Sequence, residues 1–484
     1  MTPTLVQSPL QTPRVGFRAS GVRGDPALDP LRGKIESGER LTLEEGMVLF
    51  ETPDLWSVCA MADSVRRRLH GDVGYYNINR HLNYSNVCAL SCKFCEFYRK
   101  QGDDGAYTRD MAYVREQVAA AVEGGATEMH MVGGLHPYLP WSYYPELLAT
   151  VRETARALGS ELHIKAFTAV EIVHLAKIAK VYKSDDRRAG IRWVLSELEQ
   201  AGLGSLPGGG AEVFDDRVHD EAYKGKIRSD VWLDVHREAH ALGLNTNATI
   251  LYGHIEQRHD RLVHMHMLRR EQDAALLGLG YSGVEDGRQQ ISKAATQRIS
   301  EGHLGYRGDD GEVPVVTLTR AGVPLPVGNL GGSGTADSER RGSRGYYQTI
   351  IPLPFFPDGS ELERLPGPSG LENLRTLAVS RLMLDNFPHV KAFWIMQTLA
   401  MSQLMLQCGA DDIDGTVHWY DITKVGGAST HQEVTVATLK KAIRDAGFRP
   451  VERDTLYREV VREGKTWRVN SGIDRRRETD ATDG

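Results

Sequence analysis

The segment Asn86-Val87-Cys88-Ala89-Leu90-Ser91-Cys92-Lys93-Phe94-Cys95 brings three of the five cysteines of the chain within eight residues. Thiolates are the usual ligands of iron–sulfur clusters, which generally take four of them. A loop with this spacing can hold three corners of a cluster and leave the fourth iron open to another ligand. The spacing therefore predicts a [4Fe–4S] cluster on Cys88, Cys92 and Cys95.

Two other interpretations of these cysteines are weaker. Structural zinc takes four nitrogen or sulfur ligands, and His81 lies close enough in sequence to supply the fourth, but zinc ligands usually come as two separated pairs. A non-catalytic iron–sulfur electron carrier would need a fourth thiolate. Cys59 and Cys408 are remote in sequence and lie in apolar helical contexts, where we expect small core residues.

The cluster loop follows the first of eight short apolar segments that alternate with helical ones. This alternation predicts an α/β fold, a parallel (β/α)8 barrel of the TIM type, whose chemistry takes place at the carboxyl ends of the strands. The expected strands are 75–78, 128–132, 162–167, 211–214, 247–251, 346–352, 391–395 and 411–415. The expected helices are 111–123, 143–158, 170–180, 191–201, 229–242, 258–276 and 371–384, with the last connection through 397–407.

The rest of the chain is divided by composition. We expect a disordered leader at 1–30, a helical preamble at 31–72 in which Thr42 and Glu45 form a capping box, and the barrel with a C-terminal extension at 73–463. Residues 275–344 are rich in Gly, Ser and charge, which predicts a flexible insertion that leaves the barrel face opposite the chemistry. Within it, 313–319 and 323–327 are candidates for a small hairpin, and 464–484 for a disordered tail.

Composition and charge exclude some functions. The 484 residues are 41% hydrophobic and 25% charged, and the net charge is −6, which gives no reason to expect nucleic acid as a partner. No apolar run reaches the roughly 20 residues that a membrane span needs, and the leader has no apolar core of a signal peptide. We therefore expect a cytoplasmic protein.

Several stretches of the sequence resemble a known family. The cysteine spacing, with Phe94 before the last cysteine, is that of the radical S-adenosylmethionine (SAM) superfamily. Six further stretches resemble the aminofutalosine synthases of the futalosine route to menaquinone, over about 31–275 and 345–460. They are NRH at 79–81, VGGLHP at 132–137, HIKAFTAVE at 163–171, LPGGGAEVF at 206–214, YGHIE at 252–256 and AVSRLMLDNFPH at 378–389.

This resemblance implies a transferase reaction in which SAM is consumed as a co-substrate. The deoxyadenosyl radical of SAM would add to the vinyl carbon of an aryl enolpyruvyl ether, 3-[(1-carboxyvinyl)oxy]benzoate. Aryl migration, loss of a carboxyl carbon and oxidation would then give 6-amino-6-deoxyfutalosine. The electron that starts the reaction by cleaving SAM would come from an external reductant of the flavodoxin or ferredoxin type. The alternatives within the superfamily are sister enzymes of the same build, the cyclic dehypoxanthine futalosine synthases and the deazaflavin-forming enzymes.

The resemblance also points to residues that would bind SAM. Gly133 and Gly134 end the second expected strand, and glycine lets backbone approach a ligand closely. Glu212 ends the fourth expected strand, where a carboxylate can bind the SAM ribose or amine; an ion pair at the barrel mouth is the alternative. Gly253 and Glu256 match part of the GxIxGxxE pattern that contacts adenine in radical SAM enzymes, although Thr249 and Leu251 depart from it. His254, within that stretch, is a further candidate, with capping of the following helix as the alternative.

A dicarboxylate substrate needs cations, so Arg80, Lys165 and Arg381 are candidates for its carboxylates. Helix-to-sheet ion pairs are the alternative for each of them. Asp411, Asp412 and Asp414 are expected near the eighth strand, where they would orient polar groups at the barrel mouth or form a turn.

Overall fold

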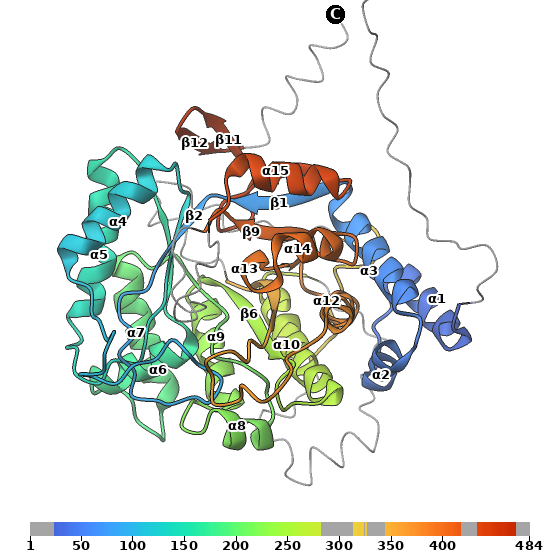
Figure 1. The fold of residues 1–484 in the computed structure, drawn as a ribbon, viewed down its shortest axis with the longest axis horizontal. Helices are drawn as coiled ribbons and strands as arrows, with labels where there is room; N and C mark the ends of the chain where they lie inside the picture. Colours follow the sequence, from blue (N-terminus) through green and yellow to red (C-terminus); the bar gives the residue numbers. More distant parts are fainter. Residues whose placement is uncertain (1–23, 282–312, 324, 327–343, 418–432, 471–484) are drawn as a thin grey trace, which may run out of the picture.

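Parallel strands form the centre of the computed structural model, which describes residues 24–281, 313–323, 325–326, 344–417 and 433–470 (Figure 1). Seven of them make one curved sheet in the order β2-β3-β4-β5-β6-β7-β8. Their bounds are β2 Asn79–Leu82, β3 Glu128–Met131, β4 His163–Ala166, β5 Ser205–Leu206, β6 Asn245–Tyr252, β7 Tyr347–Pro354 and β8 His389–Val390. Because every pairing is parallel, the carboxyl ends of all seven strands lie at the same edge of the sheet.

An eighth strand position closes the sheet into a barrel. β1 (Val73–Asn77) runs into β2 with only Ile78 between them, and it pairs in parallel with β9 (Asp412–Gly415). On its other side β9 reaches the end of β8 through a bridge between Lys391 and Asp412. The ring therefore runs from β2 to β8 and returns through β9 to β1, which confirms the expected (β/α)8 barrel.

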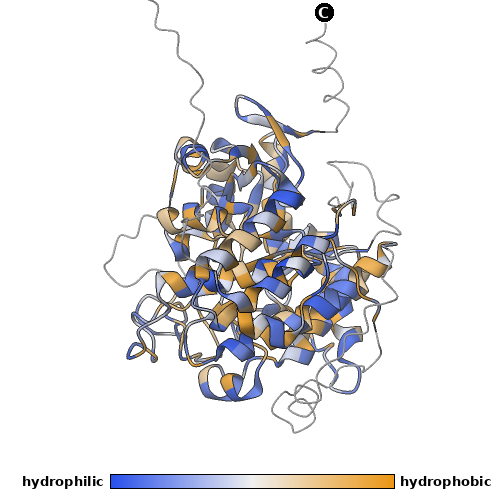
Figure 2. Ribbon diagram, turned by 90° about the vertical axis from the view of Figure 1, so that its right-hand side faces the viewer, coloured by the Kyte–Doolittle hydropathy of each residue, from blue (hydrophilic) through white to orange (hydrophobic). Residues whose placement is uncertain are grey.

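Helices cover the outside of the barrel. In Figure 1, α4 to α7 lie along one side, and α10, α12 and α14 along the other. Figure 2 shows hydrophilic and hydrophobic residues interspersed along the helices of the molecule, as expected for helices that pack one face on a sheet. Their bounds are α4 Met111–Glu123, α5 Tyr143–Ala157, α6 Ala169–Ile178, α7 Arg187–Ala201, α8 Asp216–Ala222, α9 Ser229–Ala241, α10 Arg258–Gly278, α12 Gly370–Met383, α13 Trp394–Gln397 and α14 Leu399–Leu406.

The residues before the barrel fold into helices that pack on its flank. These are η1 (Pro26–Leu28), α1 (Asp29–Ser37), α2 (Leu43–Glu51) and α3 (Leu55–His70), and α3 lies against α12. The capping box is present: the Thr42 hydroxyl accepts from the N–H of Glu45, whose carboxylate accepts from the N–H of Thr42. None of the described helices is both long and apolar enough to cross a membrane.

The end of the chain returns to the first strand. After α15 (Val436–Asp445), β10 (Arg449–Glu452) pairs in parallel with β1, on the side away from β9. β11 (Val460–Glu463) and β12 (Thr466–Val469) then form an antiparallel hairpin. β1 is thus held between two strands from the last quarter of the chain.

Two of the expected strands are wrong. The fourth strand is Ser205–Leu206, and 211–214 is coil after it, because Pro207 has no N–H to donate and the glycines that follow turn the chain. Gly208 passes so close to β6 that a Cβ would lie 2.6 Å from backbone atoms of Ala248. The seventh strand, expected at 391–395, ends at Val390 and gives way to α13.

The expected segment boundaries also need correction. Residues 24–30, expected in the leader, are folded, and the Leu28 side chain is fully buried. The expected tail begins later, because β12 lies within it. Residues 1–23 and 471–484 lie outside the described residues.

Part of the expected insertion is packed. Within 313–323, Val316 and Leu318 are buried against Leu276 and Tyr346. The expected hairpin with 323–327 stays a prediction, because residues 324 and 327 lie outside the described residues. The Val316 N–H also donates to Asp273 of α10. These contacts fix the segment because it supplies apolar side chains and backbone partners to the start of β7 and the end of α10. Residues 282–312, 324 and 327–343 lie outside the described residues.

Candidate functional site

A cavity of about 330 Å³ opens where the barrel strands end. The loops after β2, β3, β4 and β5 line its outer end, and side chains that point inward from the strands line its inner end. The outer end contains the three clustered cysteines, with Phe94, Gly133, Gly134, Glu212 and Lys226. The inner end contains His81, His130, Lys165, Asn247, Thr249, Lys391 and Asp414. The cavity therefore has a sulfur-rich end and a charged end.

The cysteine loop is held in place by bonds from outside it. The Lys100 ammonium donates to the carbonyl oxygens of Cys88 and Leu90, at 3.1 and 2.9 Å, and also to the carbonyl of Ala89. The N–H of Lys93 donates to the carbonyl of Ala222 at the end of α8. The loop is thereby fastened both to its own continuation and to a neighbouring helix.

The three thiols fit an iron–sulfur cluster. Cys88, Cys92 and Cys95 are free thiols that line the same end of the cavity. The N–H of Leu135 points to the Cys88 sulfur at 3.4 Å, an arrangement that stabilises a metal-bound thiolate. Burial raises the pKa of Cys92 to about 11, so at neutral pH this thiol loses its proton to solvent only when a metal binds the sulfur.

The other two cysteines lie elsewhere. Cys59 on α3 and Cys408 after α14 are buried in the hydrophobic core and contact each other, and neither lines the cavity. Since all five cysteines are among the described residues, the cavity offers no fourth thiolate. A site with three thiolates leaves one iron of a cubane cluster open.

Gly133 and Gly134 have no room for a side chain, because residues 84–87, which lead into the cluster loop, pack directly against them. A Cβ on Gly134 would lie 2.3 Å from the carbonyl oxygen of Val87, and one on Gly133 2.6 Å from the Tyr84 ring. The N–H of Gly133 donates to Glu171, and that of Gly134 to the carbonyl of Ser85. Both residues line the cavity, but their N–H groups are already bonded within the protein.

Glu171, which the sequence did not indicate, organises this corner. Its carboxylate accepts from the Tyr84 hydroxyl at 2.6 Å, from the N–H of Gly133 at 3.0 Å and from the N–H and hydroxyl of Thr168. Thr168 is the N-cap of α6, and with Glu171 it forms a capping box. The HIKAFTAVE stretch shows this box as T-x-x-E, which was the available signal.

The expected adenine contacts are not in the cavity. Among the described residues that line it, Gly253, His254 and Glu256 are absent. Glu256 accepts from the N–H groups of Gly253 and His254, at 2.6 and 2.9 Å, and pairs with Arg261 at 2.8 Å. These residues shape the turn after β6, where Gly253 has a φ of +90°. Thr249 and Leu251, which depart from the pattern, are the ones that line the cavity.

The inner end of the cavity holds two buried ion pairs. Lys165 on β4 pairs with Glu128 on β3 at 2.7 Å, and Lys391 pairs with Asp414 on β9 at 3.1 Å. Lys391 was missed because the expected strand began at this residue, which put it at the end of the barrel away from the chemistry. In the structure β8 ends at Val390, so Lys391 directly follows the strand. Each ammonium group has three N–H donors, so both lysines can bind a ligand in addition to their carboxylates.

Two imidazole rings lie beside these lysines. His81 and His130, on adjacent strands, have ring centroids 4.4 Å apart. Burial lowers the pKa of His81 to about 4 and that of His130 well below its ordinary value, so both rings are neutral at neutral pH. The charged end of the cavity therefore contains a pair of neutral histidines.

Two candidate cations prove to lie elsewhere. Arg80 points from β2 toward α4 and donates to the side chain of Gln117 at 2.6 Å. Arg381 on α12 is fully buried and binds Asp411 and the carbonyl of Gly409. Neither side chain lines the cavity. Both make contacts between a helix and the sheet, which was the alternative to substrate binding.

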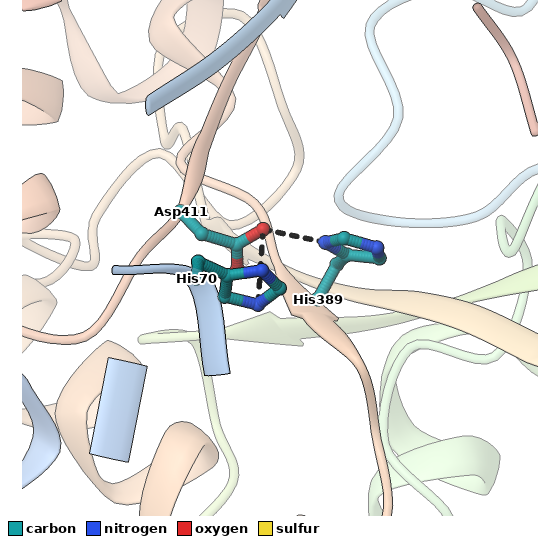
Figure 3. A group of neighbouring side chains, drawn as sticks. All are labelled: His70, His389 and Asp411. Atoms are coloured by element: carbon teal, nitrogen blue, oxygen red, sulfur yellow. Dashed lines mark hydrogen bonds and ion pairs between the residues drawn. The ribbon is translucent and has the colours of Figure 1, made fainter. Parts of the chain in front are cut away.

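Asp411 belongs to a second cluster, with His70 and His389 (Figure 3), whose ligand atoms lie within 4.8 Å of one another. Its geometry does not favour a metal ion. One oxygen of Asp411 binds Arg381 and the N–H of Val390, and the other binds Nδ1 of His389. Nε2 of His70 donates to a backbone carbonyl, that of Pro388. The guanidinium already supplies the positive charge, so this cluster closes the amino-terminal end of the barrel as a polar network.

Comparisons with known proteins agree with this geometry. Residues 82–268 match the radical SAM superfamily, and residues 343–464 match the CofH/MqnC C-terminal region. Among solved structures, methylornithine synthase superposes with a TM-score of 0.57 at 14% identity, covering 87% of this chain and 97% of that one. At this identity the likeness shows the fold alone.

Three relatives that match this chain over most of its length have a higher sequence identity than the solved structure above. The aminodeoxyfutalosine synthase of Thermus thermophilus is 36% identical over 91% of this chain and 97% of its own length. That of Streptomyces coelicolor is 39% identical over 90% of this chain and 94% of its own. The 5-amino-6-(D-ribitylamino)uracil–L-tyrosine 4-hydroxyphenyl transferase of Methanosphaerula palustris is 31% identical over 89% of this chain and 97% of its own.

Proposed function

The chain belongs to the radical SAM superfamily and, within it, to the family of aminodeoxyfutalosine synthases, and from this we propose which of its residues serve that reaction. The enzyme adenosylates 3-[(1-carboxyvinyl)oxy]benzoate with SAM and gives 6-amino-6-deoxyfutalosine. The observation that carries the assignment is the match, along nearly the whole chain, to two aminodeoxyfutalosine synthases at 36–39% identity.

The outer end of the cavity is the place for the cofactors. Cys88, Cys92 and Cys95 would hold a [4Fe–4S] cluster with one open iron, and the fourth position belongs to SAM. When bound, this group supplies the electron that cleaves SAM to methionine and the 5′-deoxyadenosyl radical. The protein contributes the thiols, the N–H of Leu135 on the Cys88 sulfur and the Lys100 clamp on the loop.

SAM itself would lie between the loops after β2, β3 and β5. Phe94, Gly133, Gly134 and Glu212 line this end of the cavity beside the cysteines. We assign the SAM ammonium group to the backbone carbonyls of the two glycines, since an ammonium donates hydrogen bonds and both glycine N–H groups are bonded within the protein. Glu212 supplies a carboxylate for the SAM amine or ribose. The adenine would meet Thr249 and Leu251 at the end of β6.

The inner end of the cavity is suited to the acidic substrate. Lys165 and Lys391 are the cations that line it, among the described residues, apart from Lys226 at the cysteine end. We assign the benzoate carboxylate to these two ammonium groups, since each keeps donors beyond its ion pair. This places the aryl ether between the charged inner end and the SAM site.

The sister reactions are less well supported. The 4-hydroxyphenyl transferase of Methanosphaerula palustris shares the fold and length, but its identity of 31% is below the 36% and 39% of the two synthases. A non-catalytic carrier would not need a cavity of about 330 Å³ beside its cysteines.

A flavodoxin or ferredoxin would supply the electron that reduces the cluster. The free thiols of the chain suit a reducing compartment, the cytoplasm.

An isotope experiment tests this function. Protein reconstituted without oxygen is incubated with reductant, the enolpyruvyl ether in excess and SAM labelled in its ribose. Adenosylation puts the label into an aryl-containing product heavier than the substrate, with methionine formed in step. In a sister enzyme that abstracts hydrogen, the label appears as free 5′-deoxyadenosine. If enzyme that cleaves SAM puts no label into an aryl product, the adenosylation is ruled out.

A further inference from the structure

Lys226 is a buried cation at the cysteine end of the cavity. It lies in the connection between α8 and α9, and its backbone is fixed at two points: its N–H donates to the carbonyl of Tyr223, and its carbonyl accepts from the His219 ring. Its ammonium lies 4.9 Å from the centre of the Phe94 ring, next in sequence to Cys95. The side chain lines the cavity together with the three cysteines.

Glu212 holds this cation in place. Lys226 Nζ and Glu212 Oε1 are 2.5 Å apart, and the two side chains are 13% and 10% exposed. Glu212 has a φ of +49°, a conformation that is costly for a residue with a Cβ, and its carbonyl accepts from the N–H of Leu251 on β6. The fold thus maintains a strained backbone that puts a carboxylate on this lysine.

The charge of Lys226 lies beside the cysteine loop. Its ammonium is held over the ring of Phe94, which lies between Cys92 and Cys95 in sequence, and its side chain lines the cavity with both cysteines. The ion pair with Glu212 stabilises the charged form of this buried ammonium. Lys93, by contrast, lies between Cys92 and Phe94 in sequence but is exposed, so water screens its charge.

A buried charge beside a redox group changes its potential. Reduction by one electron adds a negative charge to the cluster, and a cation nearby stabilises that form most where water is excluded. Glu212 reduces the net effect, because its negative charge acts on the cluster in the opposite sense. The effect of the pair on the cluster is therefore the difference between these two opposite contributions.

We propose that Lys226 raises the reduction potential of the cluster and that Glu212 limits this rise, so that the pair sets the potential at which the external reductant can deliver its electron. The proposal rests on the proposed function only through the cluster on Cys88, Cys92 and Cys95. Lys226 is a positioning residue in this role, since it acts on the cluster through its charge.

The test is a redox titration of the reconstituted full chain without SAM or substrate, followed by the EPR signal of the reduced cluster. Lys226→Met should shift the midpoint to more negative potential, Lys226→Arg should stay near the wild type, and Glu212→Gln should shift it to more positive potential. Lys93→Met, the matched exposed control, should shift it several times less than Lys226→Met. Iron and sulfide content, measured first, shows that each variant holds its cluster.

Opposite signs for Lys226→Met and Glu212→Gln support the proposal, and equal midpoints in wild type and both variants overturn it. If Lys226→Met does not fold, Glu212→Gln against wild type decides by the sign of its shift. Shifted midpoints in an enzyme that forms no adenosylated product would overturn the proposed function and leave this proposal intact. Normal product formation with unshifted midpoints would overturn the proposal for Lys226 and Glu212 and leave the proposed function intact.

Discussion

Lys165 on β4 and Glu128 on β3 form an ion pair at the inner end of the cavity, with 2.7 Å between Nζ and Oε1. The two side chains are 4% and 0% exposed. Removing one partner of such a pair leaves the other charge buried and typically costs about 3–5 kcal/mol. The pair therefore links the stability of the barrel to the place where we assign the substrate carboxylate.

The first prediction separates these two roles of Lys165. Lys165→Met should lower the free energy of unfolding by about 3 kcal/mol, because Glu128 is left uncompensated. Adding Glu128→Gln should restore most of that stability. If Lys165 binds the substrate carboxylate, the double variant should still show a KM for the enolpyruvyl ether at least tenfold higher, with cleavage of SAM retained. Arg80→Gln, which removes a cation outside the cavity, is the control, and an unchanged KM in the double variant would exclude Lys165 from substrate binding.

The second prediction concerns the ligands of the cluster. Cys92→Ala should lose the cluster on anaerobic reconstitution, because the cavity has no other thiolate to replace it. Cys59→Ala and Cys408→Ala should keep about four irons and four sulfides. Metal analysis of protein purified without oxygen checks both. Retained zinc with no uptake of iron would show that the three thiols form a zinc site.

The third prediction concerns the lysine that clamps the cluster loop. Lys100→Met removes the donor to the carbonyls of Cys88, Ala89 and Leu90, so the loop should hold its cluster less firmly. We expect a several-fold faster loss of iron to a chelator, with little change in the thermal unfolding midpoint. Lys93→Met, in the same loop with an exposed side chain, is the comparison. Equal rates of iron loss in the two variants would contradict a clamping role.

The fourth prediction concerns Arg40, which joins the preamble to the barrel. Its guanidinium binds Asp273 of α10 at 2.6 Å, Asp385 after α12 at 2.9 Å and the carbonyl of Val316. Arg40→Met should cost about 3–5 kcal/mol in chemical denaturation, because two buried carboxylates lose their partner. Lys441→Met, which breaks an exposed pair with Asp445, should cost less than about 0.5 kcal/mol. A cost for Arg40→Met no greater than that of the control would show that the carboxylates find other partners.

The fifth prediction is an acid sensitivity caused by buried histidines. Burial lowers the folded-state pKa below the unfolded value of about 6.5, so below that pH the unfolded chain binds protons that the folded one refuses. Stability is therefore full above about pH 6.5 and falls until the pH reaches the folded pKa, about 4 for some of these histidines and about 3 for the others, by about 2 kcal/mol per neutral histidine between pH 7 and 5. The histidines concerned include His81 and His163, with pKa about 4, and His70, His240 and His264, with pKa about 3.

Denaturant titrations of the cluster-free protein at pH 7, 6 and 5 check this dependence. His240→Gln can keep a hydrogen bond to Thr246 without the titration, so its stability should depend less on pH than that of the wild type. The pKa of Asp411 is depressed as well, because His70, His389 and Arg381 outweigh its burial, but its contribution is lost only below about pH 4. A midpoint that is the same at all three pH values would refute the histidine explanation.

The sequence predicted what depends on local spacing. The three cysteines, the strand–helix alternation and the Thr42–Glu45 capping box each lie within a few residues of chain, and the structure contains all of them. The glycine pair was expected to let the backbone approach a ligand; the structure shows it packed closely against Tyr84 and Val87, and its contact with SAM stays a prediction.

What the sequence did not predict depends on distant partners. Arg381 was a candidate for substrate, but its partner Asp411 lies on another element and shares no local pattern with it. Lys391 was missed because its direction depends on where β8 stops. The packing of 313–323 was not predicted, because the Gly, Ser and charged residues around this segment indicate a flexible insertion, and the partners of Val316 and Leu318 lie far away in sequence.

The position of β1 between β9 and β10 has a consequence for synthesis on the ribosome. β1 is made near the start of the chain, but both strands that pair with it are made near the end. Until then its edges stay open, and such edges are prone to wrong pairing and aggregation. We therefore expect slow, post-translational closure of the barrel, and nascent chains truncated before residue 412 that need a chaperone to remain soluble.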